Sequence, residues 1–328
     1  MANLSTTYLG LELKNPFIVG SSGLTATYEG IARLAKNGAA AVVLKSIFEE
    51  EIQMEFREAL KNQLGPQDNN LDFLDYLDYQ IKADVLSKTT ELIRRVKADF
   101  DLKVIASIHC RSVGEWFAYA AKLQEAGADA LELNIYRLPS ALEVSAAQIA
   151  EGNERIIEKV MKHVRIPVSV KMSAYTTDVA YTAQRYAQLG VKGLVLFNRF
   201  YQPDIDLENN RVVGGQVYSN PTDYTWPLRW VSILAPKVAL DLAASNGVHT
   251  ADTAVKMLVA GAAAIQVVSS VYKNGPDYLL DLQHGLDRWM DKKGLQDMAA
   301  LRAYGRAMMP ENPELFERVQ FMKYFGEV

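Results

Sequence analysis

The chain has few of the residues that form disulfide bonds and metal clusters, with one cysteine and four histidines among 328 residues. The single cysteine, Cys110, excludes an internal disulfide, and four scattered histidines argue against a zinc cluster. No apolar run approaches the roughly 20 residues that a membrane span needs, and the first residues do not resemble a signal peptide. We therefore expect a cytoplasmic protein that needs no metal and does not enter a membrane.

The chain also lacks a large excess of charge of either sign, because 35 basic and 39 acidic residues leave a formal net charge of −4. Nucleic-acid-binding domains usually carry a basic patch or face. We therefore expect no nucleic acid and no acidic membrane surface as a partner. Hydrophobic residues make up 49% of the chain, which is enough for a large core, and residues 1–328 are predicted to form a single domain.

What the chain does contain is a series of eight short apolar runs separated by amphipathic stretches. Strands that are buried on both faces have this appearance. The runs cover residues 17–19, 41–44, 104–108, 130–133, 168–170, 194–197, 238–242 and 265–268. A strand followed by a helix eight times predicts an α/β fold of the TIM (β/α)8 barrel type. Residues 4–16 alternate as a hairpin with Gly10 at its turn, which can close the floor of the barrel.

Two connections are longer than the few residues usual between a strand and the next helix, and both are expected as inserted loops at the C-terminal face. Residues 48–84, acidic and rich in aromatics, form either a lid over a substrate site or a helical hairpin packed on the rim. Residues 199–226 contain Gly214 and Gly215, which are candidates for a close approach to a ligand. Paired glycines also occur in ordinary turns.

Nearly every predicted strand ends in a polar residue, at the end of the barrel that carries active sites. Lys45 and Lys171 each follow an apolar run. A lysine there can neutralise an anionic ring, form a Schiff base, pair with a phosphate or make a rim salt bridge. Asn134 and Asn198 suit the edge of a flat heterocycle or cap the next helix. His109 is either an acid–base group or a buried structural histidine.

The last two predicted strands are followed by small residues, several of which carry hydroxyl groups. The loops after strands seven and eight of this fold often bind phosphate, and the N–H groups at a helix start suit an anion. The candidates for this role are Ser245, Asn246, Gly247, Ser269 and Ser270. The alternative is an ordinary loop with a helix cap.

With these residues in place, the chain resembles the dihydroorotate dehydrogenase family of flavin-dependent barrels. The likeness rests on residues 15–23, 44–46, 127–134, 170–173 and 261–267. The resemblance implies FMN as the cofactor, with Ser21 and Ser22 in the loop that cradles the flavin and Lys45-Ser46 in contact with it. It also implies Lys171 near the polar edge of the ring and the phosphate between the last two loops. The family moves a hydride between a substrate carbon and flavin N5.

The substrate side departs from the family pattern. Shortly after the strand-four asparagine the family has a Cys or Ser base, and that position falls here at Arg137 or Leu138. Arginine stays protonated in proteins, and leucine has no proton to exchange. Tyr136 or Ser140 can replace the base only if the loop rearranges. If Arg137 and Arg199 face the mouth, they favour an anionic substrate.

The family's substrate loop is also absent, since residues 63–70 do not match it. We therefore predict a homodimeric, FMN-dependent oxidoreductase that acts on a dihydropyrimidine-like or other small anionic substrate. Its candidate catalytic residues are Lys45, Tyr136, Arg137 and Asn198. The alternatives are a flavin-binding relative without catalysis, and an aldolase or lyase that forms a Schiff base on Lys171 or Lys45.

Overall fold

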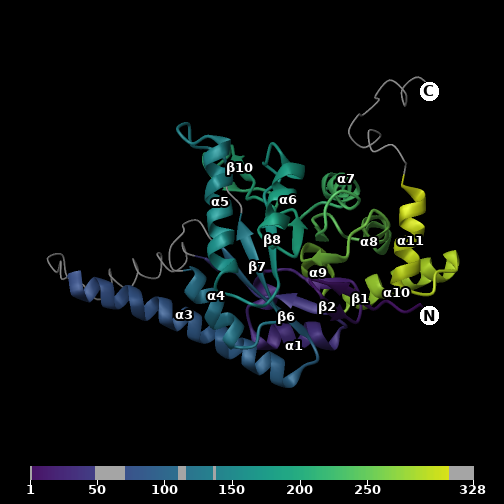
Figure 1. Cartoon of the computed structure of the whole chain (residues 1–328), viewed down its shortest axis with the longest axis horizontal. Helices are drawn as coiled ribbons and strands as arrows, with labels where there is room; N and C mark the ends of the chain where they lie inside the picture. Colours follow the sequence, from purple (N-terminus) through teal and green to yellow (C-terminus); the bar gives the residue numbers. More distant parts are fainter. Residues whose placement is uncertain (1, 49–70, 110–115, 136–137, 310–328) are drawn as a thin grey trace.

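The computed structural model describes residues 2–48, 71–109, 116–135 and 138–309. Eight strands in this part form a closed parallel barrel, so the predicted α/β TIM barrel is confirmed (Figure 1). They are β3 (Phe17–Val19), β4 (Ala41–Val43), β6 (Lys103–His109), β7 (Ala130–Ile135), β8 (Val168–Met172), β9 (Gly193–Leu196), β12 (Asp241–Ser245) and β13 (Ala264–Val267). The ladder closes because β13 pairs with β3 and β4 pairs with β6. A short strand, β5 (Ile47–Phe48), also pairs with β6.

Helices alternate with these strands and surround the barrel. They are α1 (Tyr28–Lys36), α3 (Leu71–Asp99), α4 (Trp116–Glu125), α5 (Ala146–Met161), α6 (Val179–Gln188), α7 (Thr225–Leu234), α8 (Ala251–Val259), α9 (Ser269–Asn274), α10 (Tyr278–Lys293) and α11 (Met298–Met308). Side-chain caps fix several starts: Thr27 accepts a hydrogen bond from the N–H of Gly30, and Thr250 from that of Thr253. The seventh barrel strand begins at Asp241, three residues later than expected, and Val238 and Leu240 lie before it along the floor hollow.

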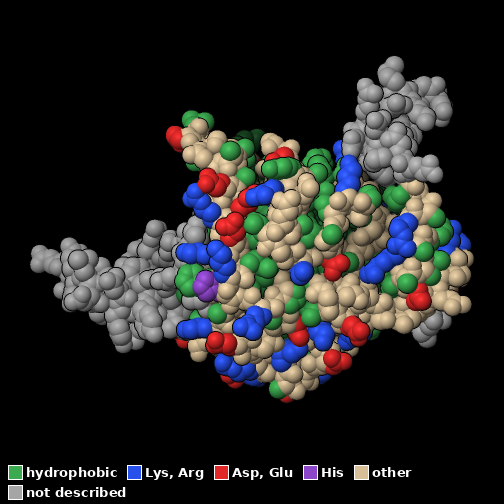
Figure 2. Space-filling model, viewed as in Figure 1, with side chains coloured by type: hydrophobic (Ala, Val, Ile, Leu, Met, Phe, Trp, Pro, Cys, Tyr) green, Lys and Arg blue, Asp and Glu red, His purple; other side chains and the backbone are tan. Residues whose placement is uncertain are grey.

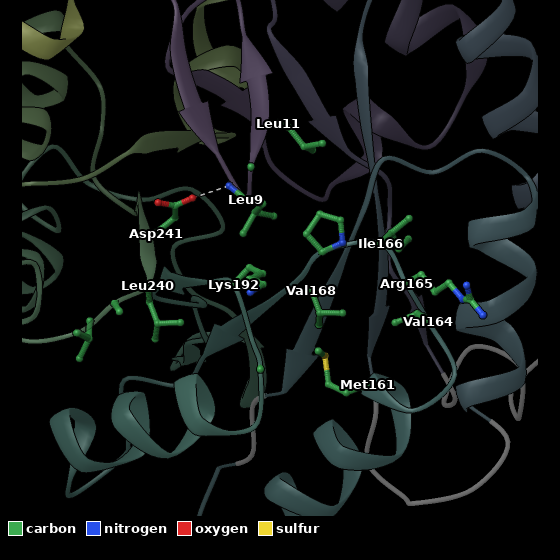
Figure 3. Close-up of a pocket in the computed structure, with 15 residues that line it drawn as sticks. Leu9, Leu11, Met161, Val164, Arg165, Ile166, Val168, Lys192, Leu240 and Asp241 are labelled. Atoms are coloured by element: carbon green, nitrogen blue, oxygen red, sulfur yellow. Dashed lines mark hydrogen bonds between the residues drawn. The ribbon is translucent and has the colours of Figure 1, made fainter.

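The predicted N-terminal hairpin is present and closes the floor. Strands β1 (Thr6–Tyr8) and β2 (Leu11–Leu13) are antiparallel, and Leu9 and Gly10 make the turn with φ of 56° and 74°. Tyr8 and Leu9 pack against apolar side chains inside the barrel. The N–H of Leu9 donates to Asp241 Oδ2 at 2.6 Å, which ties the turn to the start of β12 (Figure 3).

The inside of the barrel changes from apolar to polar along the strands. Side chains two residues apart face the same side of a strand. The apolar cluster around the hairpin contains Ile18, Ala41, Val43, Ile105, Ala130, Val195, Ala243 and Ala264. On four strands, the residue two positions after an apolar member of this cluster is polar and buried. These residues are Ser107, Glu132, Ser245 and Gln266, which follow Ile105, Ala130, Ala243 and Ala264. The barrel therefore has an apolar floor and a polar mouth.

The insertion at residues 199–226 contains a second hairpin at the upper edge of the molecule, formed by β10 (Pro203–Asp206) and β11 (Arg211–Gly214) (Figure 1). Its apolar side chains are exposed, including Ile205, Leu207 and Val212. Basic and acidic side chains are intermixed over the lower part of the face that Figure 2 shows. Of the other insertion, residues 49–70 lie outside the described residues, and residues 71–84 form the first part of α3.

Among the described helices, none combines the length and the apolar character needed to cross a membrane. Within the same residues, no group of three or more His, Cys, Asp or Glu side chains is placed to hold a metal ion.

Candidate functional site

The barrel has a hollow at each end. The floor hollow, of about 800 Å³, lies between the hairpin turn and the starts of β8, β9 and β12 (Figure 3). The mouth cavity, of about 210 Å³, is lined by the residues that end β3, β8, β9, β12 and β13 and by part of the 199–226 insertion. Although the floor hollow is larger, enzymes of this fold carry their active sites at the C-terminal ends of the strands. The mouth is therefore the candidate site.

Seven of the residues predicted from the sequence line this cavity together. They are Ser21, Lys171, Asn198, Ser245, Asn246, Gly247 and Ser269. Asn134 adjoins them, because Asn198 Nδ2 donates to Asn134 Oδ1 at 2.5 Å. The pairing of β7 with β8 places Asn134 opposite Lys171. The structure thus gathers an ammonium group and two amides at one side of the mouth.

Lys171 extends from the inward face of β8 and is 8% exposed. Its Nζ donates to Gln266 Oε1 at 3.1 Å, and Gln266 lies on β13. An ammonium group has three donors, so this bond leaves Lys171 able to bind a ligand in the cavity. Its placement favours the reading as a ligand-binding lysine over the alternative of a rim salt bridge.

The loop after β12 takes a left-handed backbone turn at two successive residues. Asn246 has φ of 77° and Gly247 has φ of 70°. Asn246 is held by a hydrogen bond from Nδ2 to the carbonyl oxygen of Phe197, 2.9 Å long. A Cβ at position 247 would collide with the backbone of Tyr224, so this close approach requires glycine. The turn places small residues, and hence backbone N–H groups, beside the cavity.

The loop after β13 is tied to the end of the insertion. Ser269 Oγ accepts from the N–H of Ser219 at 3.0 Å, and Ser219 Oγ lies 2.9 Å from His249 Nε2. Burial lowers the pKa of His249, and the charge of Lys273 lowers it further. Ser270 is buried behind the lining residues. Ser269 Oγ only accepts in this bond, so its O–H proton stays available to donate to a ligand, as does that of Ser245.

Other predicted residues lie outside the cavity lining. The Oγ of Ser22 donates to the carbonyl of Gly20. Ser46 is buried one step behind Ser21, with its N–H donating to Ser21 Oγ at 2.9 Å. The side chain of Lys45 is exposed. Tyr136 and Arg137 lie outside the described residues.

Gly214 and Gly215, predicted at the cofactor, serve the β10–β11 hairpin instead. Gly214 pairs with Pro203, and the N–H of Gly215 donates to the carbonyl of Gln202. A Cβ at Gly215 would stand 2.8 Å from that carbonyl oxygen. Gly215 is therefore required by its close approach to Gln202 at the open end of the hairpin, whereas a Cβ at Gly214 would make only an ordinary contact with Tyr201.

Arg199 lines the mouth, but its guanidinium is committed to the insertion. Its Nη1 donates to the carbonyls of Gln216 and Val217, both at 2.7 Å, and its Nε lies 3.9 Å from Asp223 Oδ2. Arg199 therefore holds residues 216–217 near the mouth. Its donors face two backbone carbonyls, the side-chain oxygen of Gln202 and a carboxylate, and recognition of an anionic substrate by Arg199 stays a prediction.

Two buried residues of the mouth, Glu132 and Gln266, were not predicted as site residues. Both stand within apolar runs of the sequence. Glu132 lies in the middle of β7 and is 1% exposed, and Gln266 lies on β13 and is 2% exposed. Gln266 Nε2 donates to Glu132 Oε2 at 2.6 Å. A carboxylate inside a buried strand costs free energy unless it is paired, and that feature of the sequence could have identified it.

His109 was expected to be either an acid–base group or a structural histidine, and its contacts favour the second. It is buried, its Nδ1 lies 2.9 Å from the carbonyl oxygen of Asn134, and its ring packs on Phe48 at 5.0 Å between centroids. This bond links the end of β6 to the end of β7.

The donor set of the mouth fits a flavin mononucleotide. A phosphate needs N–H and hydroxyl donors with little side-chain bulk, as Ser245, Asn246 and Gly247 supply. A flat ring with carbonyl and nitrogen edges needs an ammonium and amides, as Lys171 and Asn198 supply. These two groups of residues border a single cavity.

The fold and this donor set define a class of protein, the TIM barrels that bind a phosphate-bearing ring at the mouth. A family model described as dihydroorotate dehydrogenase matches residues 3–290. The chain belongs to the dihydroorotate dehydrogenase family, as the resemblance in its motifs implied. This membership agrees with FMN as the cofactor.

Individual relatives support the assignment. The chain is 26% identical over 319 residues to the catalytic subunit of dihydroorotate dehydrogenase B (NAD(+)) from Thermoplasma acidophilum, covering 92% of this chain and 99% of that protein. It is 26% identical over 322 residues to the NAD-dependent dihydropyrimidine dehydrogenase subunit PreA of Escherichia coli K12, covering 91% and 76%.

Among solved structures, a dihydroorotate dehydrogenase from Eimeria tenella in complex with ferulenol has a similar fold. The TM-score is 0.64 at 16% identity, covering 92% of this chain and 87% of the other. At this identity the likeness supports the barrel fold and not a substrate.

Proposed function

We propose that this protein binds FMN in the mouth cavity and transfers a hydride between a small anionic substrate, such as a dihydropyrimidine, and the flavin. The observation that carries the proposal is the shared cavity of Lys171, Asn198 and the Ser245–Gly247 turn. When bound, FMN supplies the hydride acceptor or donor. The protein supplies the cavity, the charge and the hydrogen bonds that orient both ligands.

Each residue has a distinct part in this proposal. Lys171 donates from its ammonium group to the polar edge of the ring. Asn134 and Asn198 fix each other through their 2.5 Å hydrogen bond, and each amide keeps further donors or acceptors for substrate or ring. The small residues of the Ser245–Gly247 turn admit the phosphate. Lys45, exposed beside the buried Ser46, lies on the substrate side in this proposal.

Proton transfer is the part of the reaction that departs from the family pattern. Leu138, one of the two residues at the base position, is 52% exposed and cannot exchange a proton. We propose that Tyr136 handles the proton or Arg137 binds the substrate's anionic group. A second function follows from the same observation: a flavin-binding relative without catalysis, since the usual base is missing.

Anaerobic reduction of the FMN-loaded protein distinguishes these two functions. We expect the flavin absorbance to bleach with at least one donor from a panel that contains dihydroorotate, dihydrouracil, NADH and NADPH. Bound flavin that no donor reduces would favour the non-catalytic relative. Protein that neither retains nor takes up FMN would reject both, and borohydride trapping of a carbonyl compound on Lys171 would then support the Schiff-base alternative.

The proposal also includes a homodimer in the cytoplasm with a place in pyrimidine metabolism. The β10–β11 hairpin supports a protein contact, because Ile205, Leu207 and Val212 are 65%, 82% and 70% exposed. Apolar side chains gathered on one surface often mark an interface. Light scattering of the purified protein tests this part, and a mass of one chain (36.5 kDa) would contradict it.

A further inference from the structure

Glu132 is a buried carboxylate that the proposed function leaves unused. It stands on β7 between Ala130 and Asn134 on the inward face, where the lower positions of the barrel are apolar. Burial raises the pKa of Glu132, while the charge of Lys171 and the hydrogen bond from Gln266 act in the opposite direction. A buried ionisable group lowers stability unless its partners compensate, so its place beneath the mouth calls for a functional reason.

The hydrogen bond that the Glu132 side chain accepts crosses the barrel. In the strand order, β7 and β13 lie on opposite sides, yet Gln266 Nε2 reaches Glu132 Oε2 at 2.6 Å. The other end of the same amide, Gln266 Oε1, accepts from Lys171 Nζ at 3.1 Å. Carboxylate, amide and ammonium therefore form one continuous relay across the base of the mouth.

The chemistry of the three groups fixes the direction of this relay. A carboxylate only accepts, so Gln266 must turn its NH2 group toward Glu132. Its carbonyl oxygen then faces Lys171, which only donates. Without the carboxylate the amide could turn over and present its NH2 group to the ammonium.

The spacing also keeps Lys171 available to a ligand. A direct ion pair would direct the ammonium toward the carboxylate, whereas here the neutral amide uses one donor of the lysine and Glu132, beyond the amide, supplies the balancing negative charge. Tyr8 is buried on the floor side, where burial and the negative charge of Glu132 raise the pKa of its hydroxyl. Among the described residues, Tyr8 makes no hydrogen bond to Gln266 or Lys171. Tyr8 is therefore a matched control for Glu132.

We infer that Glu132 is a positioning residue. Acting through Gln266, it orients the Lys171 ammonium toward the ring of the bound cofactor and balances the positive charge of that ammonium. The inference rests on the proposed function, because it assumes that FMN occupies the mouth. It assigns a role to a residue that does not line the cavity.

A double-mutant cycle tests this inference through the FMN dissociation constant of the apo-protein. Glu132→Gln should weaken FMN binding about 10-fold, the loss expected for one hydrogen bond to a charged group. In the Lys171→Met background the same substitution should change the constant less than about twofold, because the group that it positions is absent. Tyr8→Phe should leave the constant unchanged.

The reduction potential of the bound flavin distinguishes two effects of Glu132: the positioning of Lys171, and the direct electrostatic effect of the carboxylate charge on the flavin. Loss of a well-placed ammonium disfavours the anionic reduced ring, so Lys171→Met should shift the potential to a more negative value. If Glu132 positions Lys171, Glu132→Gln shifts it the same way. A shift to a more positive value would mean that only a negative charge was removed, and would overturn the inference.

The outcomes also separate this inference from the proposed function. Wild-type protein that binds no FMN rejects the proposed function and the inference together. Wild-type protein that binds FMN, with Lys171→Met weakened and Glu132→Gln unchanged, rejects the inference alone. If Glu132→Gln does not fold, as judged by thermal unfolding of the apo-protein, Glu132→Asp keeps the charge but shortens the reach and should also weaken FMN binding.

Discussion

The two ends of the barrel are built from the same eight strands and differ in what the inward positions carry. At the floor these positions hold Ala130, Ala243 and Ala264 against the hairpin, and at the mouth Asn134, Ser245 and Gln266. The larger hollow lies at the floor, but polar groups converge at the mouth. Hollow volume and polar chemistry therefore point to opposite ends of this barrel, and the proposed function follows the chemistry of the strand ends.

Glycine substitutions at the two ends should have the largest effects and should differ. Gly10 and Gly247 both have positive φ, 74° and 70°, but a Cβ meets nothing within 4 Å at Gly10 and meets the backbone of Tyr224 at Gly247. Gly10→Ala should lower the free energy of unfolding by about 1 kcal/mol, the cost of the left-handed backbone. Gly247→Ala should lower it by about 2–5 kcal/mol, because overpacking adds to that cost.

Denaturant unfolding of both variants measures this difference. Equal losses would mean that the loop after β12 moves to accept a side chain, and the mouth would then be less rigid than the floor. Gly247→Ala should also reduce FMN uptake in protein that remains folded.

Lysine substitutions compare the two ends as binding sites. Lys171 lies at the mouth, and Lys192 borders the floor hollow, where it is exposed. Lys171→Met should weaken FMN binding about 10- to 100-fold, which corresponds to one hydrogen bond from a charged group. Lys192→Met is the matched control and should bind FMN as the wild type does. Fluorescence titration of FMN measures both, and a loss at Lys192 would move the ligand to the floor.

Protonation of His249 at acidic pH should lower the free energy of unfolding. Burial lowers the pKa of His249 in the folded protein from its usual 6.5. The unfolded chain therefore binds the proton more readily, and stability is lost as pH falls below about 6.5 and through the folded pKa. His249→Gln should remove this part of the pH dependence, whereas His284→Gln, at an exposed site on α10, should not. Thermal unfolding between pH 5 and 8 measures the contrast, and equal profiles for wild type and His249→Gln would contradict it.

At the floor, titration of Asp241 should change the free energy of unfolding with pH in the opposite direction, and by a smaller amount. Burial raises the pKa of Asp241, and the hydrogen bond from Leu9 and the charge of Arg302 partly offset the rise. Its contribution to stability is present below the usual value of 3.8 and falls as pH rises through the folded pKa. Asp241→Asn should lack that decline. A decline of the same size in the variant would assign it to another group.

The barrel, and the gathering of residues at the strand ends around one cavity, could be predicted because they follow from local patterns. Buried strands appear as apolar runs, and strand direction places Lys171 and Ser245 at one end. The roles of Gly214 and Arg199 could not be predicted, because they depend on how the 199–226 insertion folds back. A carboxylate within the apolar run 130–133 was a signal for Glu132, but its contact with Gln266 could not be predicted because Gln266 lies 134 residues away on the opposite side of the barrel.

The central claim, that the mouth holds FMN, is tested most directly by the visible absorption spectrum of the protein after incubation with FMN and gel filtration. The account predicts about one flavin per chain, with an absorption band shifted from that of free FMN. Protein that emerges without flavin after saturating FMN, while still folded, would contradict it.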